Sequence, residues 1–174
     1  AMSSGVARKN IENFDIYSEQ LKQRLDPSVT IMQGINSQIK RNQKRVVFAD
    51  GEDENTLKAA IAFQKSGFGI PIIVAKEKVV KQRLKDIGYS ENFNIQIINS
   101  TNKGMRDKYK KYVFKILHRD KGFLERDCDR LVRNDRVVWG SCMVSCGDAD
   151  AMVTGNTRRY GQSLQKVLKI VKSR

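Results

Sequence analysis

Residues 45–75 read RVVFADGEDENTLKAAIAFQKSGFGIPIIVA, and the pattern in this stretch recurs through the rest of the chain. The apolar run 45–49 ends at Asp50-Gly51, which is typical of a buried strand followed by a turn. Apolar residues then recur with a helical period, at Leu57, Ala60, Ile61 and Phe63. Gly67 is typical of a helix stop, and a second apolar run occupies 70–75. The stretch therefore predicts a strand, a helix and another strand.

The same alternation continues toward the C-terminus. It predicts further strands at 95–98 and 149–153, and helices over about 77–87, 106–118, 123–132, 135–146 and 160–171. Strands that alternate with helices are joined by right-handed crossovers and form a parallel sheet. We therefore expect an α/β fold for residues 43–174, in which a mainly parallel sheet lies between two layers of helices (a three-layer α/β/α arrangement).

Residues 1–42 contain no strand-like run and predict a helical junction segment before this domain. Apolar residues recur at helical spacing in two groups, which are separated by Asp26-Pro27: Tyr17, Leu21 and Leu25, then Ile31, Ile35 and Ile39. Both predicted helices are amphipathic, so their apolar faces should lie against the following domain or a partner chain.

The composition is strongly basic. The chain holds 33 Lys plus Arg and 19 Asp plus Glu, a net charge of +14 over 174 residues. Such a charge is a first indication of nucleic-acid binding, but the positive residues are scattered and no basic block is interleaved with aromatics. A solvated surface or affinity for anionic cofactors is favoured. No run approaches the ~18 apolar residues of a membrane span, and no secretory leader opens the chain. We expect a cytoplasmic protein with no membrane contact.

The cysteines and the single histidine indicate neither a metal site nor a nucleophile. Cys128, Cys142 and Cys146 form no CxxC pair, so a disulfide framework and a zinc site are disfavoured. Cys142 and Cys146 share one helix face, which is typical of buried small residues. His118 lies in a lysine-rich helix, where exposure is the ordinary outcome. We predict no catalytic residue and no metal ligand in this chain.

Two loops are candidates for a ligand site, because open α/β sheets bind ligands at the carboxyl ends of their strands. The first contains Asp50, Gly51 and Glu52. It is acidic and opens a helix, so capping of that helix by Asp53, Glu54 or Thr56 is the alternative explanation.

The second candidate loop consists of Thr154, Gly155, Asn156, Thr157 and Arg158. Glycine, hydroxyl and amide groups before a predicted helix, followed by arginine, suit an anion such as phosphate or a carboxylate. Capping of the last helix by Asn156 or Thr157 explains the same residues without a ligand. No GxGxxG follows a strand and no GxxxxGK[ST] occurs, so neither a dinucleotide fingerprint nor a P-loop is supported.

Three separated motifs together resemble the phosphotransacetylase family. They are VVFADGEDE (46–54), PIIV (71–74) and GDADAMVTG (147–155), and the resemblance runs from about residue 44 to the C-terminus. It implies two α/β subdomains with the acyl-CoA and phosphate site in the cleft between them. This chain carries the first subdomain only. The serine, arginine and aspartate central to acetyl transfer in that family lie in the second.

Other segments resemble the phosphotransacetylase-like tail of bacterial NADP-dependent malic enzymes. AMSSGVAR (1–8) and YSEQL (17–21) are similar to the junction that precedes this tail, and DCDRLV (127–132) and TRRY (157–160) are similar to the tail itself. The resemblance implies that the malic-enzyme catalytic lysine and tyrosine, the metal-binding carboxylates and the nicotinamide site lie before Ala1. It places NADP and a divalent metal in the parent enzyme and no cofactor in this chain.

The leading hypothesis is a regulatory and oligomerisation domain of an NADP-dependent malic enzyme, which converts malate to pyruvate by oxidative decarboxylation, with a response to acetyl-CoA. The alternative is a truncated phosphate acetyltransferase, which transfers acetyl between coenzyme A and phosphate. A basic nucleic-acid-binding module is the third. We expect weak binding of acetyl-CoA or phosphate, and self-association into a dimer or larger assembly, because the incomplete subdomain and the amphipathic helices leave apolar surface uncovered.

Overall fold

The computed structural model describes residues 13–25, 27–89 and 95–171. Contacts divide the chain into two compact units, with the boundary between Arg41 and Asn42. In the first unit the described residues form the two predicted helices, α1 (Phe14–Leu25) and α2 (Pro27–Arg41). Proline is suited to the start of α2, because a first-turn residue needs no backbone N–H for the helix ladder.

The second unit alternates strands and helices along the chain, as the sequence predicts. Its elements are β1 (Lys44–Phe48), α3 (Glu54–Lys65), β2 (Gly69–Val74), α4 (Glu77–Asp86), β3 (Gln96–Ile98), α5 (Lys103–Lys121), α6 (Glu125–Asn134), α7 (Arg136–Ser145), β4 (Ala151–Val153) and α8 (Tyr160–Ile170). The strands form one sheet in the order β3-β2-β1-β4, and every pair is parallel. None of the helices described is long and apolar enough to cross a membrane.

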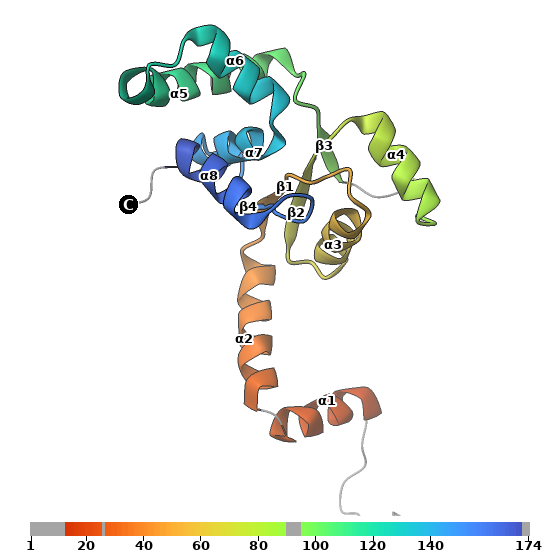
Figure 1. Cartoon of the computed structure of the whole chain (residues 1–174). Coiled ribbons are helices and arrows are strands. Elements are labelled where there is room, and N and C mark those ends of the chain that lie inside the picture. The colour runs from red at the N-terminus through yellow and green to blue at the C-terminus, as the bar shows by residue number, and fades with distance from the viewer. Residues whose placement is uncertain (1–12, 26, 90–94, 172–174) are drawn as a thin grey trace, which may run out of the picture. The chain divides into compact units, whose positions relative to one another are not determined.

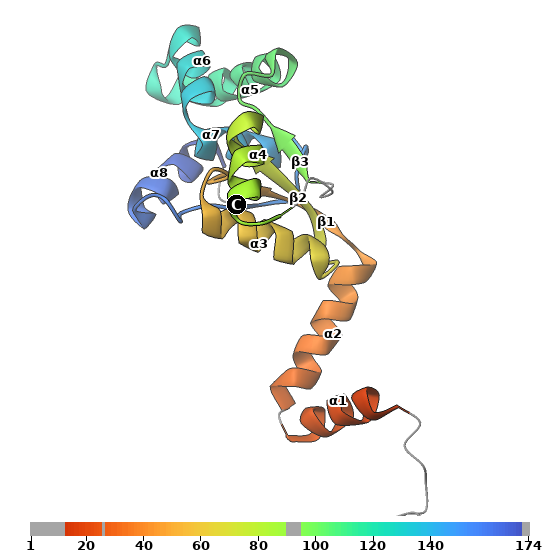
Figure 2. The ribbon, with the colours of Figure 1, turned by 90° about the vertical axis from the view of Figure 1, so that its right-hand side faces the viewer.

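Side chains that alternate along the strands build a core on each face of the sheet. Val47 and Ile72 point into a core with α5, α6 and α7, whereas Phe48 and Ile73 point into a core with α3 and α4. Figure 1 shows α7 and α8 on one side of the sheet and α3 and α4 on the other, and Figure 2 gives the same layers from a second direction. The expected α/β/α arrangement is confirmed. Trp139 of α7 is fully buried, with its ring edge-on to Tyr109 at 5.0 Å between centroids.

Local polar groups set where the helices begin and end. Asp53, Asn102 and Asp135 accept backbone N–H groups at the starts of α3, α5 and α7. Gly67 and Gly122, with φ of 69° and 64°, follow the ends of α3 and α5, because glycine adopts left-handed backbone without strain. These caps extend α5 beyond the predicted 106–118 at both ends.

The fourth strand is shorter than the predicted 149–153. Pairing with β1 begins only at Val46 and Ala151. Immediately before it, the Asp150 carboxylate accepts the Arg45 backbone N–H at 2.8 Å, and the Asp150 N–H donates to the Arg45 carbonyl at 2.9 Å. A side chain thus takes over a backbone ladder position, and the strand begins at Ala151, two residues later than predicted.

Close approach of β1 and β2 requires a glycine at position 69. A Cβ there would collide with the Lys44 carbonyl oxygen and the Phe63 ring. We expect Gly69→Ala to lower the free energy of unfolding by about 1 to 3 kcal/mol, as overpacked sites do, measured by urea unfolding. Gly161→Ala in α8 is the matched control, because open space surrounds that position. It should be neutral or stabilise by up to about 1 kcal/mol. An equal loss of unfolding free energy in both variants would contradict the requirement for glycine at position 69.

Candidate functional site

The two predicted loops lie together at the carboxyl edge of the sheet. The first leaves β1 after Phe48 and the second leaves β4 after Val153, and these two residues are paired in the parallel ladder. The Ala49 N–H donates to the Val153 carbonyl at 3.1 Å. Topology therefore brings residues about a hundred positions apart in the chain into one site.

The Asp50 carboxylate occupies the donors of the second loop. Its Oδ2 accepts the backbone N–H groups of Gly155 at 2.9 Å and Asn156 at 3.1 Å. Its Oδ1 accepts the Thr157 hydroxyl at 2.6 Å, and the Thr154 hydroxyl reaches Oδ2 at 3.4 Å. The loop is thus an anion-binding turn, and the anion within it is a side chain of this chain.

Hydrogen bonding keeps Asp50 ionised. Burial alone would raise the pKa of Asp50, but the bonds from Thr157, Gly155 and Asn156 outweigh it and lower the pKa below the ordinary 3.8. Donors directed at the charged form stabilise that form. At neutral pH the loop therefore faces a full negative charge from Asp50.

Asn156 joins the second loop to the start of α3. Its Nδ2 donates to Asp53 Oδ1 at 2.5 Å and lies 3.3 Å from the Thr56 hydroxyl. Asp53 also caps α3 through the Thr56 N–H, as the alternative explanation for the first loop proposed. The matching alternative for the second loop is wrong, because neither Asn156 nor Thr157 caps α8. That helix has Arg159 at its N-cap position, with no side-chain cap bond.

The remaining charged residues of the two loops are bound to the junction between α6 and α7. Arg158 Nη1 contacts both oxygens of Asp135 at 3.2 Å, and Lys166 pairs with the same carboxylate. Glu52 of the first loop pairs with Arg136 at 2.5 Å. Adjacent residues of one junction therefore hold both loops. Gly51 is buried, and a Cβ there would collide with the Ile73 side chain, so backbone packing accounts for this residue.

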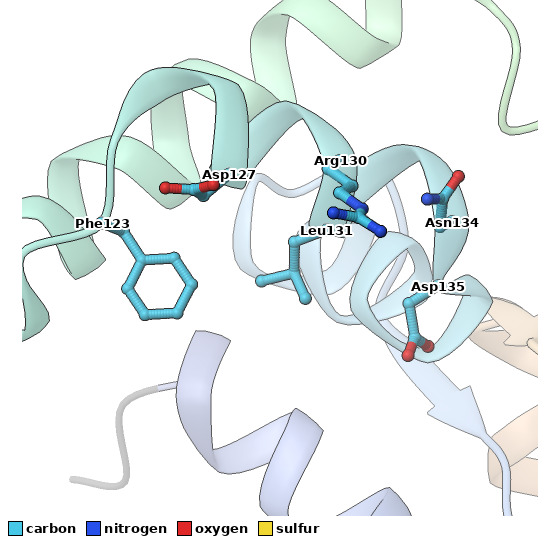
Figure 3. Close-up of a pocket in the computed structure, with 6 residues that line it drawn as sticks. All are labelled: Phe123, Asp127, Arg130, Leu131, Asn134 and Asp135. Atoms are coloured by element: carbon cyan, nitrogen blue, oxygen red, sulfur yellow. The ribbon is translucent and has the colours of Figure 1, made fainter.

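A hollow of about 270 Å³ lies beside this junction, and the sequence analysis did not identify it. Figure 3 shows its lining along α6 and the turns on either side: Phe123, Asp127, Arg130, Leu131, Asn134 and Asp135. Asp135 is shared with the Arg158 ion pair. No sequence signal marks the hollow, because its apolar and charged residues follow the ordinary pattern of an amphipathic helix.

The cysteines and His118 take structural positions. Cys142 is fully buried, and burial raises the pKa of its thiol; the thiol pKa of half-buried Cys146 is raised for the same reason. Neither forms a thiolate at neutral pH. The exposed His118 contacts the Phe123 carbonyl through Nδ1 at 3.0 Å, beside the end of α5. Among the residues described, no group of three or more His, Cys, Asp or Glu is arranged to hold a metal ion.

This fold and loop pair define an open parallel α/β domain with a polar site at the carboxyl edge of its sheet. The family model described as phosphate acetyl/butaryl transferase matches residues 30–174, so the chain belongs to that family. A phosphotransacetylase from Streptococcus pyogenes has the same fold, with a TM-score of 0.75 and 26% identity over 83% of this chain and 43% of that structure.

Within that family, the curated relatives point to malic enzymes. A probable NADP-dependent malic enzyme of Rickettsia prowazekii is 38% identical over 98% of this chain. An NADP-dependent malic enzyme of Rhizobium meliloti is 37% identical over the same share. The chain spans about 22% of the length of each. It is thus similar to a phosphotransacetylase-like part of these longer enzymes.

The Asp50 interaction predicts a specific acid dependence of stability. We expect Asp50→Asn to lower the free energy of unfolding by about 1.5 to 3 kcal/mol at pH 7, which is the usual contribution of hydrogen bonds to a charged group. The folded-state pKa lies below 3.8, so the contribution is complete above that value and disappears as the pH falls through the lowered pKa. Urea unfolding between pH 7 and 2.5 should show the gap to wild type closing in acid.

Asp107→Asn serves as the control for this experiment, because Asp107 is exposed on α5. Its unfolding free energy should stay within about 0.5 kcal/mol of wild type at each pH. A gap for Asp50→Asn that persists unchanged at pH 2.5 would contradict the charge assignment.

Proposed function

We propose that this chain is the first subdomain of a phosphotransacetylase-like domain in an NADP-dependent malic enzyme, and that it serves regulation and assembly rather than chemistry. The observation that carries the proposal is the extent of the match. Similarity to malic enzymes covers 98% of the chain, whereas the family model begins only at residue 30. The junction segment is therefore shared with malic enzymes, and the longer match at higher identity, 38% over 98% of the chain against 25% over 89% for a phosphate acetyltransferase, favours a malic enzyme as the parent.

The polar groups of the site support a role other than catalysis. Asp50, Glu52 and Arg158 each have a partner within the chain. The buried cysteine thiols are too weakly acidic to act as nucleophiles. The residues described do not fit a divalent metal, and the sequence holds no dinucleotide fingerprint. We therefore assign NADP, the metal and the oxidation of malate to another part of the parent enzyme.

For the regulatory ligand we propose phosphate or the phosphates of acetyl-CoA, which bind weakly at residues 154–158. An incoming anion must displace the Asp50 carboxylate from the Gly155 and Asn156 N–H groups. The net binding free energy is therefore small, because the anion replaces hydrogen bonds that Asp50 already makes. Arg158 and the exposed Arg159 supply the positive charge that draws it to the loop. The alternative of a truncated phosphate acetyltransferase rests on the similarity to the Streptococcus pyogenes structure, of which this chain spans 43%.

Titration with inorganic phosphate and with acetyl-CoA tests the ligand assignment. We expect backbone amide shifts at residues 154–158 with millimolar affinity, roughly −4 kcal/mol, because displacement of Asp50 offsets most of the gain. Arg158→Ala should weaken binding several-fold. Arg126→Ala is the control, since this arginine is 83% exposed on α6 and should change nothing. Shifts confined to surface lysines would refute binding at the loop.

The regulatory assignment also predicts where activity resides. The purified chain should form neither NADPH from malate nor acetyl phosphate from acetyl-CoA and phosphate, since it contributes neither reaction centre. In an intact malic enzyme that carries this chain, acetyl-CoA should change the rate of malate oxidation, and Arg158→Ala should remove that response without changing the basal rate. Turnover by the isolated chain, or an unchanged response in the variant, would disprove the assignment.

A further inference from the structure

We propose that the hollow along α6 is a binding site for a small monocarboxylate with an apolar body. The site is separate from the loop of residues 154–158, and the proposal does not rest on the function proposed above. The hollow has a volume of about 270 Å³. A second hollow of about 250 Å³ shares Arg130 and Asn134 with it, so these two side chains border open space on both sides.

Helical spacing brings the polar and apolar parts of this site together. The lining residues of α6 are separated by three or four positions, so they share one face of the helix: Asp127, Arg130, Leu131 and Asn134. Phe123 precedes the helix and Asp135 follows it, so the lining extends to both ends of α6. Figure 3 shows Arg130 between Leu131 and Asn134, with the ring of Phe123 at the far end.

The apolar part of the site consists of Phe123 and Leu131. Both are half-buried and pack against the core that contains Trp139, so their positions are fixed by the fold. The surface that they leave uncovered lines the hollow. A ligand with an apolar body gains by removing this surface from water, and an aromatic ring can also pack against the ring of Phe123.

The two carboxylates of the lining are already engaged within the chain. The Asp127 carboxylate accepts the Leu124 N–H at 3.3 Å, at the start of α6. The Asp135 carboxylate pairs with both Arg158 and Lys166. Burial alone would raise the pKa of Asp135, but these two cations outweigh burial and lower it below the ordinary 3.8. Neither carboxylate therefore needs a cation from a ligand.

The groups left for a ligand favour an anion. Among the residues that the structure describes, none pairs with the Arg130 guanidinium or the Asn134 amide. Asp135 is shared by two cations, so this end of the hollow has an excess of positive charge even before Arg130 is counted. Positive charge that lines a hollow attracts anions to it.

A carboxylate fits these groups better than a phosphate does. The guanidinium of Arg130 can bind both oxygens of a carboxylate in one plane, and the Asn134 side chain can donate a further hydrogen bond. Inorganic phosphate has no apolar part, so it would leave Phe123 and Leu131 uncovered. The combination of one free arginine with an apolar surface therefore selects a small organic monoanion.

Titration of the labelled 174-residue chain with benzoate tests this site by nuclear magnetic resonance. We expect backbone amide shifts at residues 123–136, with an affinity at least tenfold higher than for benzamide, which lacks the charge, or acetate, which lacks the ring. Arg130→Ala should weaken benzoate binding at least fivefold. Arg130 is exposed, so its loss should leave the fold intact, and near-ultraviolet circular dichroism of Trp139 checks this.

Arg83→Ala is the matched control, because it removes the same charge from an exposed position on α4, which packs against the other face of the sheet. Its affinity for benzoate should stay within about twofold of wild type. Three outcomes would overturn the proposal: no shifts at residues 123–136 in about 50 mM benzoate, equal affinities for benzoate and benzamide, or equal affinities in the two arginine variants. Phosphate shifts at residues 154–158 test the proposed function instead, so the two proposals can fail separately.

Discussion

The bond between Asp50 and the loop after β4 is the interaction on which the rest of this site depends. One carboxylate accepts hydrogen bonds from two backbone N–H groups and a hydroxyl of the second loop. It thereby joins the loop after β1 to the loop after β4. With that contact in place, Asn156 reaches the start of α3 and Arg158 reaches Asp135. Arg136, next to Asp135, holds the first loop through Glu52. The charged groups of the site thus form one network.

Most of the fold could be predicted because its signals are local. Apolar runs locate β1 and β2, and glycine marks the end of α3 at Gly67. The length of β4 could not be predicted, because it depends on Asp150 meeting Arg45 more than a hundred residues away. The candidate loops were located by topology, since parallel strands end at one edge. The occupation of the second loop by Asp50 could not be predicted. From the sequence alone, the loop after β4 has the features of an open anion site, and only the position of Asp50 shows that its donors are already in use.

The match to the phosphate acetyl/butaryl transferase family covers most of this chain, but not all of it. The family model covers residues 30–174, while the similarity to malic enzymes covers 98% of the chain. The domain has the same fold as a solved phosphotransacetylase. In this chain Glu52 and Arg158 of the two loops bind Arg136 and Asp135 at the α6–α7 junction, and burial raises the pKa of the Cys142 and Cys146 thiols.

The pairing of β1 with β4 also affects how the chain folds during synthesis. β1 is a central strand, yet one of its neighbours is not complete until residue 153 has been made. Until then, one edge of β1 presents unpaired backbone groups, and contacts so distant in sequence form slowly because a long loop must close first. β2 can pair with β1, and β3 with β2, while translation continues, because these strands are closer in sequence. Asp50 then remains without its partners until the final strand arrives, so the step that completes the sheet also completes the site.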